Sequence, residues 1–476
     1  MNIQHSTFNI HREIPEGARG LDSLSIGRPA LNIGRYSPAE GGSVLIIVLW
    51  VCIGLISIAL YFANSMTYEL RASDNRVSGL QAEQAIEGAA RYVNLVLLNY
   101  ATNGAFPDNT QFRCEAVLVG DARFWLIGRD PEGQNLTDPY FGLVDEGAKL
   151  SLNNASTNVL QYLPNMTTDF SDAIMDWRGT NGTISLNYAS LGYYPKYAPF
   201  ETVDELRLVY GSTIDLLAGE DVNRNGILDK NEKDYNGNGQ LDPGLFEYTT
   251  VYTREPNYHA DGSSLTNVNT ASESQIKSLF QDLGTSRAQQ IWDAIRIRRV
   301  QRQNFNGGLD FALFCKNRGV GSDQFSQFAD SVTTSTNTYF RGRVNVNTAS
   351  YAVLSALFMG AGVDQSTAEN AAQTLISYRE QNPNNLGSIA WMIDALGNNS
   401  PVITALARRN DVTTHTYQFT ADIAAVGPYG RGYRRVKFIF DISDGTPKIL
   451  YRQDLSRLGW ALGDKVREDL VANNTQ

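Results

Sequence analysis

The 476-residue chain has few of the residues from which most catalytic and zinc sites are built. It contains four histidines and three cysteines. No Ser/His/Asp or Cys/His arrangement matches a recognisable catalytic motif, and no glycine-rich phosphate loop precedes a helix. The histidines are too scattered to predict a zinc site, at His5, His11, His259 and His415. The sequence therefore favours a protein that acts by binding over an enzyme.

Three cysteines do not make a disulfide framework. Cys52 lies within a long apolar run, where it serves as a small apolar residue. Cys114 and Cys315 are able to pair if this part of the chain is exported to an oxidising compartment, although no characteristic spacing supports the pair. The alternative is that both remain buried thiols.

Basic side chains are outnumbered by acidic ones. The chain has 40 Lys and Arg against 50 Asp and Glu, a formal net charge of -10. Proteins that bind nucleic acid need a basic surface to neutralise phosphate. The composition therefore argues against nucleic acid and against other acidic partners.

The longest apolar run contains no charge from residue 44 to residue 63. At about 1.5 Å per residue, such a helix is about 30 Å long, which matches the hydrocarbon core of a bilayer. Only Ser57 interrupts its apolar surface, whereas a buried core helix usually has a polar stripe. We therefore predict one transmembrane helix over residues 43–63.

The residues around this run suggest a leader and a stalk. Residues 1–42 are polar and rich in glycine and proline, so they cannot form a core. Small residues come before the apolar run, whereas the cleavage site of a secretory signal peptide follows it. After the run no proline occurs until Pro107, and apolar or small residues recur every three or four positions. This spacing predicts that the helix continues as an amphipathic stalk.

The order of leader, Gly41-Gly42-Ser43 and apolar run resembles the N-terminus of a type IV prepilin. The resemblance implies that a prepilin peptidase cleaves between Gly42 and Ser43. Most pilins have a glutamate at the fifth mature position, which pairs with the amino terminus of a neighbouring subunit, but this chain has Ile47. An apolar residue there is typical of the K-type minor pseudopilins of type II secretion systems. Because isoleucine cannot form that charge pair, the resemblance implies a subunit at the filament tip.

Short apolar segments flank the middle of the chain and predict strands. They lie at 114–120, 123–128, 140–144, 417–426, 434–442 and 448–453. One antiparallel sheet packed on the long helix would bury them together. The predicted fold class is α+β: a pilin-like long N-terminal helix, comprising span and stalk, packed on an antiparallel sheet, with a large all-α insertion.

The insertion contains three copies of one helical unit. Related phrases occur three times, as SLNNAS at 151–156 and as NVNTAS at 267–272 and 345–350. Each places a polar capping residue where a helix begins. The units, together with segment 200–208, are similar to the SAM-like units of the K-type pseudopilins. We divide the chain into a leader (1–42), a span (43–63), a stalk with the first strands (64–147), the helical insertion (148–397), C-terminal strands (398–462) and a tail (463–476).

Two consecutive loops in the insertion match the 12-residue calcium pattern. The first has oxygen-bearing side chains at positions 1, 3, 5, 9 and 12 and glycine at position 6. The second has Leu245 at position 12, so its ligand set is incomplete unless Glu247 or a residue from elsewhere completes it. The alternative is a flexible Asn/Gly-rich linker. We predict one or two structural calcium ions, held in the first loop by Asp221, Asn223, Asn225, the Ile227 carbonyl, Asp229 and Glu232, and in the second by Asp234, Asn236, Asn238, Gln240 and Asp242.

Residues 344–379 also resemble a helix-hairpin-helix unit of competence-type DNA receptors, with Gly360-Ala361-Gly362 as the hairpin. Lys and Arg are absent from residue 351 through residue 377, so nothing in this stretch neutralises phosphate.

Taken together, the resemblance implies a single-pass inner-membrane protein with a cytoplasmic N-terminus and a periplasmic bulk. Its expected role is that of a minor pseudopilin at the tip of a type II secretion pseudopilus, acting in protein export. The expected partners are the other minor pseudopilins and the major pseudopilin, prepilin peptidase, and secreted cargo or the outer-membrane channel, but no nucleic acid. The alternatives are a membrane-anchored DNA receptor and a type IV pilus tip adhesin.

Overall fold

The computed structural model describes residues 42–101, 104–130, 137–179 and 185–473. They belong to two compact parts of the chain, which divide between Glu69 and Leu70 within helix α1 (Gly42–Tyr100). In the N-terminal part, the side chains of α1 from residue 44 to residue 69 are almost all exposed. The chain is a mixed α+β protein with a long apolar N-terminal helix and an antiparallel sheet, which confirms this coarser part of the predicted fold.

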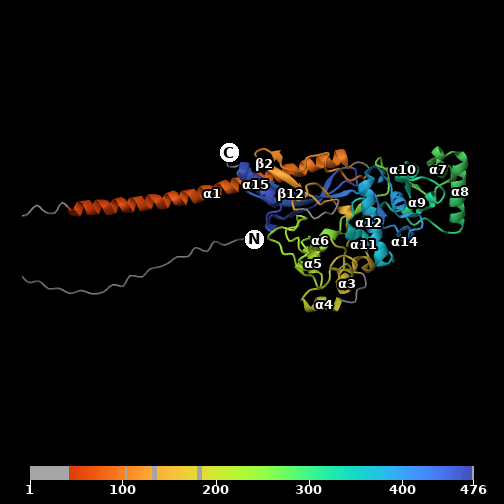
Figure 1. Cartoon of the computed structure of the whole chain (residues 1–476), viewed down its shortest axis with the longest axis horizontal. Helices are drawn as coiled ribbons and strands as arrows, with labels where there is room; N and C mark the ends of the chain where they lie inside the picture. Colours follow the sequence, from red (N-terminus) through yellow and green to blue (C-terminus); the bar gives the residue numbers. More distant parts are fainter. Residues whose placement is uncertain (1–41, 102–103, 131–136, 180–184, 474–476) are drawn as a thin grey trace, which may run out of the picture. The chain divides into compact units, whose positions relative to one another are not determined.

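In the part that begins at Leu70, α1 packs on one face of an antiparallel sheet (Figure 1). Small and apolar residues of α1 recur every three or four positions and form its buried face, from Ala82 to Leu97. The sheet order is β1-β2-β12-β13-β14, and β3 also pairs with β12. These strands are β1 (Val117–Val119), β2 (Ala122–Ile127), β3 (Val144–Asp145), β12 (Gln418–Val426), β13 (Arg434–Asp441) and β14 (Lys448–Asp454).

Strand β12 is buried along its whole length. Phe419 and Ile423 belong to the core that includes α1. Ala424 and Val426 belong to a second cluster, which contains Leu462 and a residue of α15 (Gly463–Asn473). Because side chains alternate along a strand, β12 separates two packed layers. Its pairing with β2 and β13 joins the early and late segments in one sheet, as the apolar segments predicted.

The turn between β12 and β13 lies against the backbone of α1. A Cβ at Gly427 would lie 2.4 Å from the Ser78 carbonyl oxygen, and one at Gly432 would lie 2.3 Å from the Gly79 nitrogen. Gly432 also has φ +70°, a conformation that disfavours other residues. Glycine at these positions therefore allows the turn to approach the helix closely.

The helical insertion is built from three units, and each is closed by a two-residue parallel ladder. The ladders are β4 (Leu150–Ser151) with β5 (Thr249–Thr250), β7 (Thr266–Asn267) with β8 (Val332–Thr333), and β10 (Val344–Asn345) with β11 (Val412–Thr413). An antiparallel pair, β6 (Arg254–Pro256) with β9 (Tyr339–Arg341), flanks the second unit. Each ladder joins one repeated phrase to the end of its own unit.

The helices of the three units share one hydrophobic core, in which α11 lies beside α12 (Figure 1). The first unit contains α2 (Thr157–Leu160), α3 (Thr168–Trp177), α4 (Ser185–Ser190), the 3-10 helix η3 (Val203–Leu208), α5 (Ile214–Ala218) and α6 (Leu245–Tyr248). The second contains α7 (Glu273–Leu279), α8 (Thr285–Val300), α9 (Gly308–Lys316) and α10 (Ser322–Ser326). The third contains α11 (Tyr351–Gly360), α12 (Gln365–Gln381), α13 (Trp391–Leu396) and α14 (Pro401–Ala407).

The insertion ends later than the expected boundary at residue 397. Helix α14 begins at Pro401, which is favoured at the first helical position, and buries Val402, Ile403 and Leu406 in the helical core. The third unit closes only at β11, and the long sheet strands begin at Gln418.

An arginine near the end of the second helix makes equivalent contacts in each unit. It donates hydrogen bonds to the backbone carbonyls of the second and fifth residues of the repeated phrase. The sets are Arg178 with Leu152 and Ala155, Arg299 with Val268 and Ala271, and Arg379 with Val346 and Ala349. Burial lowers the pKa of Arg379 to about 10. The arginine therefore satisfies carbonyls at the helix start, at the cost of burying a charge.

We predict that Arg379→Met lowers the free energy of unfolding by about 2 kcal/mol, because hydrogen bonds from a charged donor contribute about 1.5–3 kcal/mol and the carbonyls would lose them. Urea unfolding of the full chain in detergent measures the change. Arg408→Met is the matched control, since Arg408 is exposed in the same unit. Equal stability of the two variants would contradict the prediction.

Candidate functional site

The first acidic loop is held by hydrogen bonds among its predicted ligands. The carboxylate of Asp221 accepts the N–H groups of Asn225 and Gly226, both at 2.9 Å. The side-chain amides of Asn223 and Asn225 both donate to Asp229 Oδ2. Gly226 has φ +84° at the sharp bend, as the pattern requires. These contacts bring the side chains at loop positions 3, 5 and 9 together.

Glu232, at position 12, folds back onto this loop. Its Oε1 accepts the N–H of Asn223 at 3.0 Å, and its Oε2 accepts the N–H of Asp229 at 3.1 Å. Both carboxylate oxygens are thus turned toward the loop, in the position from which a bidentate ligand acts.

The second loop has a similar set of hydrogen bonds. Asp234 accepts the N–H groups of Gly237 at 2.6 Å and Gly239 at 2.8 Å. The amides of Asn236 and Asn238 both donate to Asp242 Oδ2, at 2.5 and 3.1 Å. The remaining predicted ligand, Gln240, donates its backbone N–H to Asn238 Oδ1 at 2.6 Å. The two loops therefore share the contacts of positions 3, 5 and 9.

Glu220 accepts the N–H at position 9 of the second loop, as Glu232 does in the first loop. Its Oε1 accepts the N–H of Tyr235 at 2.7 Å, and its Oε2 accepts the N–H of Asp242 at 3.0 Å. Glu220 is buried, with 3% of its surface exposed. Sequence reasoning missed this residue because it precedes the first loop instead of following the second.

Glu247, the residue considered for closing the second loop, has a different partner. Its Oε2 lies 2.8 Å from Arg129 Nε. Attraction to Glu247 and Asp221 raises the pKa of Arg129 despite its burial. Glu247 therefore balances a half-buried arginine, and Glu220 is the carboxylate that folds onto the second loop.

The first loop is fixed against the sheet by a buried arginine. Arg435 of β13 is fully buried and pairs with Asp422 of β12, with Nη2 2.6 Å from Oδ2. The same guanidinium donates to the carbonyl oxygens of Asn223 and, at 2.7 Å, Arg224. Asn225 Nδ2 lies 3.4 Å from the carbonyl oxygen of Ala461. The loop thus connects the helical insertion to the C-terminal part of the chain.

Asp221 of the first loop is buried and Glu232 is half-buried, and neither has full charge compensation. Burial raises the pKa of Asp221, although the charge of Arg129 opposes the rise. Burial also raises the pKa of Glu232. A bound cation would supply the missing positive charge, because loss of solvent disfavours a lone buried carboxylate.

The donor set fits a hard cation. The predicted ligands offer carboxylate, amide and carbonyl oxygens, which calcium prefers, and rotation of an Asn side-chain amide would exchange its N–H for its oxygen. Within the described residues no group of three or more His, Cys, Asp or Glu side chains is placed to hold a metal. The acidic side chains therefore do not suffice, and a site would depend on the amides and the carbonyl of Ile227.

The processing and assembly residues lie at the start of α1. Gly42 and Ser43 are its first two residues, and the rest of the predicted leader lies outside the described residues. Ile47 is 60% exposed. Within the described part of the chain, α1 is the one helix that is long and apolar enough to cross a membrane.

The disulfide that Cys114 and Cys315 could form in an oxidising compartment is absent. Cys114 and Cys315 are both free and buried. Cys114 lies in the core between α1 and the sheet, whereas Cys315 lies on α9 in the helical core. Burial raises the pKa of both thiols, that of Cys114 to about 12. Each cysteine therefore serves as a small core residue.

The hairpin of the third unit has its backbone donors engaged. The N–H groups of Ala361, Gly362 and Val363 donate to carbonyls of α11 at 2.9–3.2 Å. Asp364 caps α12 by accepting the N–H of Thr367 at 3.0 Å. A carboxylate therefore stands at the helix start where a phosphate would bind.

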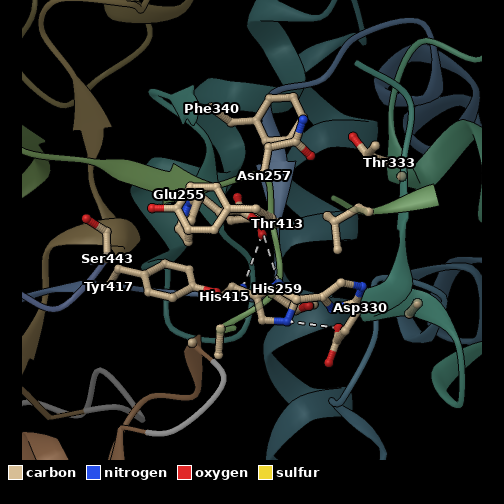
Figure 2. A pocket seen from close by; sticks show the side chains of 18 of the residues that line it. Glu255, Asn257, His259, Asp330, Thr333, Phe340, Thr413, His415, Tyr417 and Ser443 are labelled. Carbon is tan, nitrogen blue, oxygen red and sulfur yellow. Dashed lines mark hydrogen bonds and ion pairs between the residues drawn. The ribbon is translucent and has the colours of Figure 1, made fainter. Parts of the chain in front are cut away.

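A cavity of about 850 Å³ lies where the second and third helical units meet the end of the sheet (Figure 2). On its wall, His415 Nδ1 lies 3.6 Å from Glu255 and Nε2 lies 3.1 Å from Asp330. Arg343 also pairs with Glu255, at 3.2 Å. Burial disfavours the imidazolium, but the two carboxylates outweigh it and raise the pKa of His415 to about 10. Arg343 and His415 likewise outweigh burial and lower the pKa of Glu255 to about 2.

Sequence reasoning treated His415 as one of four scattered histidines. Its partners come from distant elements, since Glu255 lies on β6 and Asp330 lies on a 3-10 helix before β8. No spacing in the sequence indicated this cluster. Because both ring nitrogens face carboxylates, His415 is the centre of an ion-pair cluster and not a free base.

Comparison with protein-family models finds none that matches the chain, and a search of curated proteins finds no match.

We predict that His415→Gln lowers the free energy of unfolding by about 2 kcal/mol near pH 6.5, the order of a charge-assisted hydrogen bond. The folded-state pKa is raised to about 10, so the stabilisation is complete below the unfolded pKa of about 6.5 and is lost as the pH rises through 10. The difference between wild type and variant should therefore shrink from pH 6.5 to pH 10. Urea unfolding at several pH values measures it, and a constant difference would contradict the prediction.

Proposed function

We propose that the protein is a minor pseudopilin of a type II secretion system, inserted in the inner membrane through α1 and located at the tip of the periplasmic pseudopilus. One observation carries the proposal. The same helix begins at the small residues Gly42 and Ser43, continues as an exposed apolar run, and then packs a buried face on an antiparallel sheet. This order is what a processed, membrane-anchored assembly subunit requires.

The position at the tip rests on Ile47. An apolar residue at the fifth mature position cannot neutralise the amino terminus of a subunit ahead of it. A subunit with nothing ahead of it needs no such charge, and leaving an unpaired carboxylate in the bilayer would be costly. Ile47 is therefore suited to the first subunit of a filament.

The protein acts by binding. Leu80, Leu95 and Leu98 of α1 are each more than half exposed, although residues between 82 and 97 on another face of the same helix are buried. Such a surface suits contacts with fellow pseudopilins. The helical insertion is the part available to secreted cargo or to the outer-membrane channel.

A DNA receptor is the less favoured function. The N–H groups of the Gly360-Ala361-Gly362 hairpin that are described above are bonded within the chain, and Asp364 places a carboxylate beside them. The net charge of -10 also opposes phosphate binding.

We further propose that the two acidic loops bind two structural calcium ions. Asp221, Asn223, Asn225, Asp229 and Glu232 would hold the first ion together with the Ile227 carbonyl. Asp234, Asn236, Asn238, Gln240 and Asp242 would hold the second, with Glu220 in the closing position. The support is the matching hydrogen-bond pattern of the loops and the raised pKa of Asp221 and Glu232. Calcium would stabilise the docking of the insertion on the sheet.

Coexpression with a prepilin peptidase tests the processing step. We expect a mature protein that begins at Ser43, identified by N-terminal sequencing. Gly42→Leu should remain unprocessed because a bulky residue replaces the glycine before the cleaved bond, whereas the neighbouring Gly41→Ala control should be cleaved. An intact leader on the wild-type chain would contradict the proposal.

A second measurement distinguishes a secretion filament from other filaments of processed subunits. Deletion of the gene in its own cell should stop release of proteins into the medium, and the wild-type chain should restore it. Unchanged release would contradict a role in secretion.

Calcium removal tests the two loops. We expect a chelator to lower the melting temperature of the full chain in detergent, because a ligand at about 100 times its Kd stabilises the folded state by about 2.7 kcal/mol. Calcium titration should give two ions for wild type, one for Glu220→Gln, and two for the exposed matched control Glu115→Gln. Melting that is unchanged by chelator would contradict the proposal, and two ions for Glu220→Gln would exclude Glu220 as a ligand.

A further inference from the structure

Partly exposed apolar side chains gather on the wall of the cavity beside His415 (Figure 2). Leu98 comes from α1, Val332 from β8 and Phe340 from β9. Tyr258 comes from the segment that follows β6. All four side chains keep part of their surface exposed. A volume of about 850 Å³ lies within the range of about 300–1,000 Å³ that is typical of small-molecule sites. The cavity therefore presents accessible apolar surface in a concave site.

The four charged groups of the His415 cluster balance one another on this wall. Arg343 pairs with Glu255, and His415 lies between Glu255 and Asp330. Burial opposes the charge of His415, but the two carboxylates raise its pKa to about 10, so the imidazolium persists at neutral pH. Two carboxylates thus face two cations, and the cluster has no charge left over for a ligand.

The two other acidic side chains that line the cavity are exposed to solvent. Asp444 lies 2.9 Å from Lys448 Nζ and 3.2 Å from Arg254 Nη2, so it already has two cationic partners. Asp261 lies on the same loop as the lining residue His259, where water screens its charge. Neither carboxylate therefore brings a buried negative charge to the cavity.

The wall also carries a hydroxyl group that a ligand can reach. Tyr417 lines the cavity just before β12 and is half-buried. Its hydroxyl is not sealed from solvent, and it makes no hydrogen bond with another described residue. Burial raises the pKa of Tyr417, so this hydroxyl stays protonated. Because a phenolic hydroxyl both donates and accepts, Tyr417 offers one hydrogen bond in the midst of apolar surface.

The character of this wall favours an uncharged ligand over an ion. An ion would lose part of its hydration without gaining an unpaired opposite charge inside the cavity, which is costly. An aromatic ring would instead meet the rings of Tyr258, Phe340 and Tyr417, and pairs of rings favour offset or edge-on contacts. The cavity thus combines aromatic and alkyl surface, balanced charges and one reachable hydroxyl.

We propose that this cavity binds an uncharged aromatic ligand that bears a hydroxyl group. The ring would contact the wall formed by Leu98, Val332 and Phe340, and the hydroxyl group would form a hydrogen bond with the hydroxyl of Tyr417. This chemistry has two sources: the side chain of a tyrosine in a peptide, or a free aromatic alcohol. The proposal does not depend on calcium binding or on a role in secretion.

Binding to the full chain in lipid nanodiscs tests the proposal. The probes are phenylbutanol, phenylbutylamine and phenylbutanoate, which share a ring and an alkyl chain and differ in charge at neutral pH. Calorimetry measures the affinity of each probe, and empty nanodiscs give the lipid background. We expect phenylbutanol to bind about tenfold more tightly than either charged probe, a difference of about 1.4 kcal/mol, because only the charged probes must give up the hydration of an ion.

Two variants and their matched controls identify the residues. Tyr417→Phe keeps the ring and should weaken phenylbutanol about fivefold, as expected for the loss of one hydrogen bond between uncharged groups. Tyr351→Phe, at an exposed tyrosine outside the cavity, should leave the affinity unchanged. Leu98→Ser, at a half-exposed position where folding is not at risk, should weaken all three probes. Leu80→Ser, at a similarly exposed position of the same helix outside the cavity, should weaken none.

A peptide probe, acetyl-Leu-Tyr-Leu-amide, separates the two sources. Tighter binding of this peptide than of phenylbutanol would support a tyrosine side chain, and the reverse order would support a free aromatic alcohol. Equal binding of the three phenyl probes, tightest binding of a charged probe, no binding of any probe, or a Tyr417→Phe variant that keeps the wild-type affinity for phenylbutanol would each overturn the proposal.

Discussion

Burial of β12 on both faces is the constraint on which the rest of this structure depends. One face packs on α1, and the other meets the C-terminal segment. Asp422 points from this strand into a buried ion pair with Arg435, whose remaining donors bind carbonyls of the loop. Removing one partner of such a pair would leave an unpaired buried charge, which costs about 3–5 kcal/mol. The sheet and the insertion are thus joined through polar contacts that tolerate few changes.

The insertion solves a related problem with a repeated device. Short helices leave backbone groups unsatisfied at their ends, and many such ends meet inside its core. In each unit an arginine donates to two carbonyls of the repeated phrase. The asparagine at the third position of each phrase also donates to carbonyls outside its own phrase, as Asn153, Asn269 and Asn347 do. Hydrogen bonds from side chains therefore replace the regular structure that such short elements lack.

The acidic loops and the His415 cluster differ in how their charges are balanced. In the first loop, backbone N–H groups and amides surround carboxylates whose pKa is raised by burial. At the cavity, ion pairs satisfy Arg343 and His415, because Glu255 and Asp330 balance both cations. The first loop therefore favours a positively charged ligand, whereas the cluster around His415 is balanced by its own ion pairs. The loops offer an all-oxygen set that suits a metal ion.

The sequence by itself determined the elements whose cause is local. The length of the stretch without charged residues identified the apolar run. Apolar residues spaced three and four positions apart identified the buried face of α1. Alternating apolar and polar residues, bounded by turn residues, located β12, β13 and β14. The repeated phrases and the positions of both acidic loops were also readable, because each depends on residues within a short window. Only the tertiary structure decided the contacts between distant segments. Glu220 closes a loop that begins fourteen residues later, α14 joins the helical core and not the sheet, Cys114 and Cys315 lie in separate cores, and His415 meets Glu255 and Asp330. The physical reason is that a carboxylate, a thiol or an imidazole carries no periodic pattern, so its partner is known only once the chain has folded.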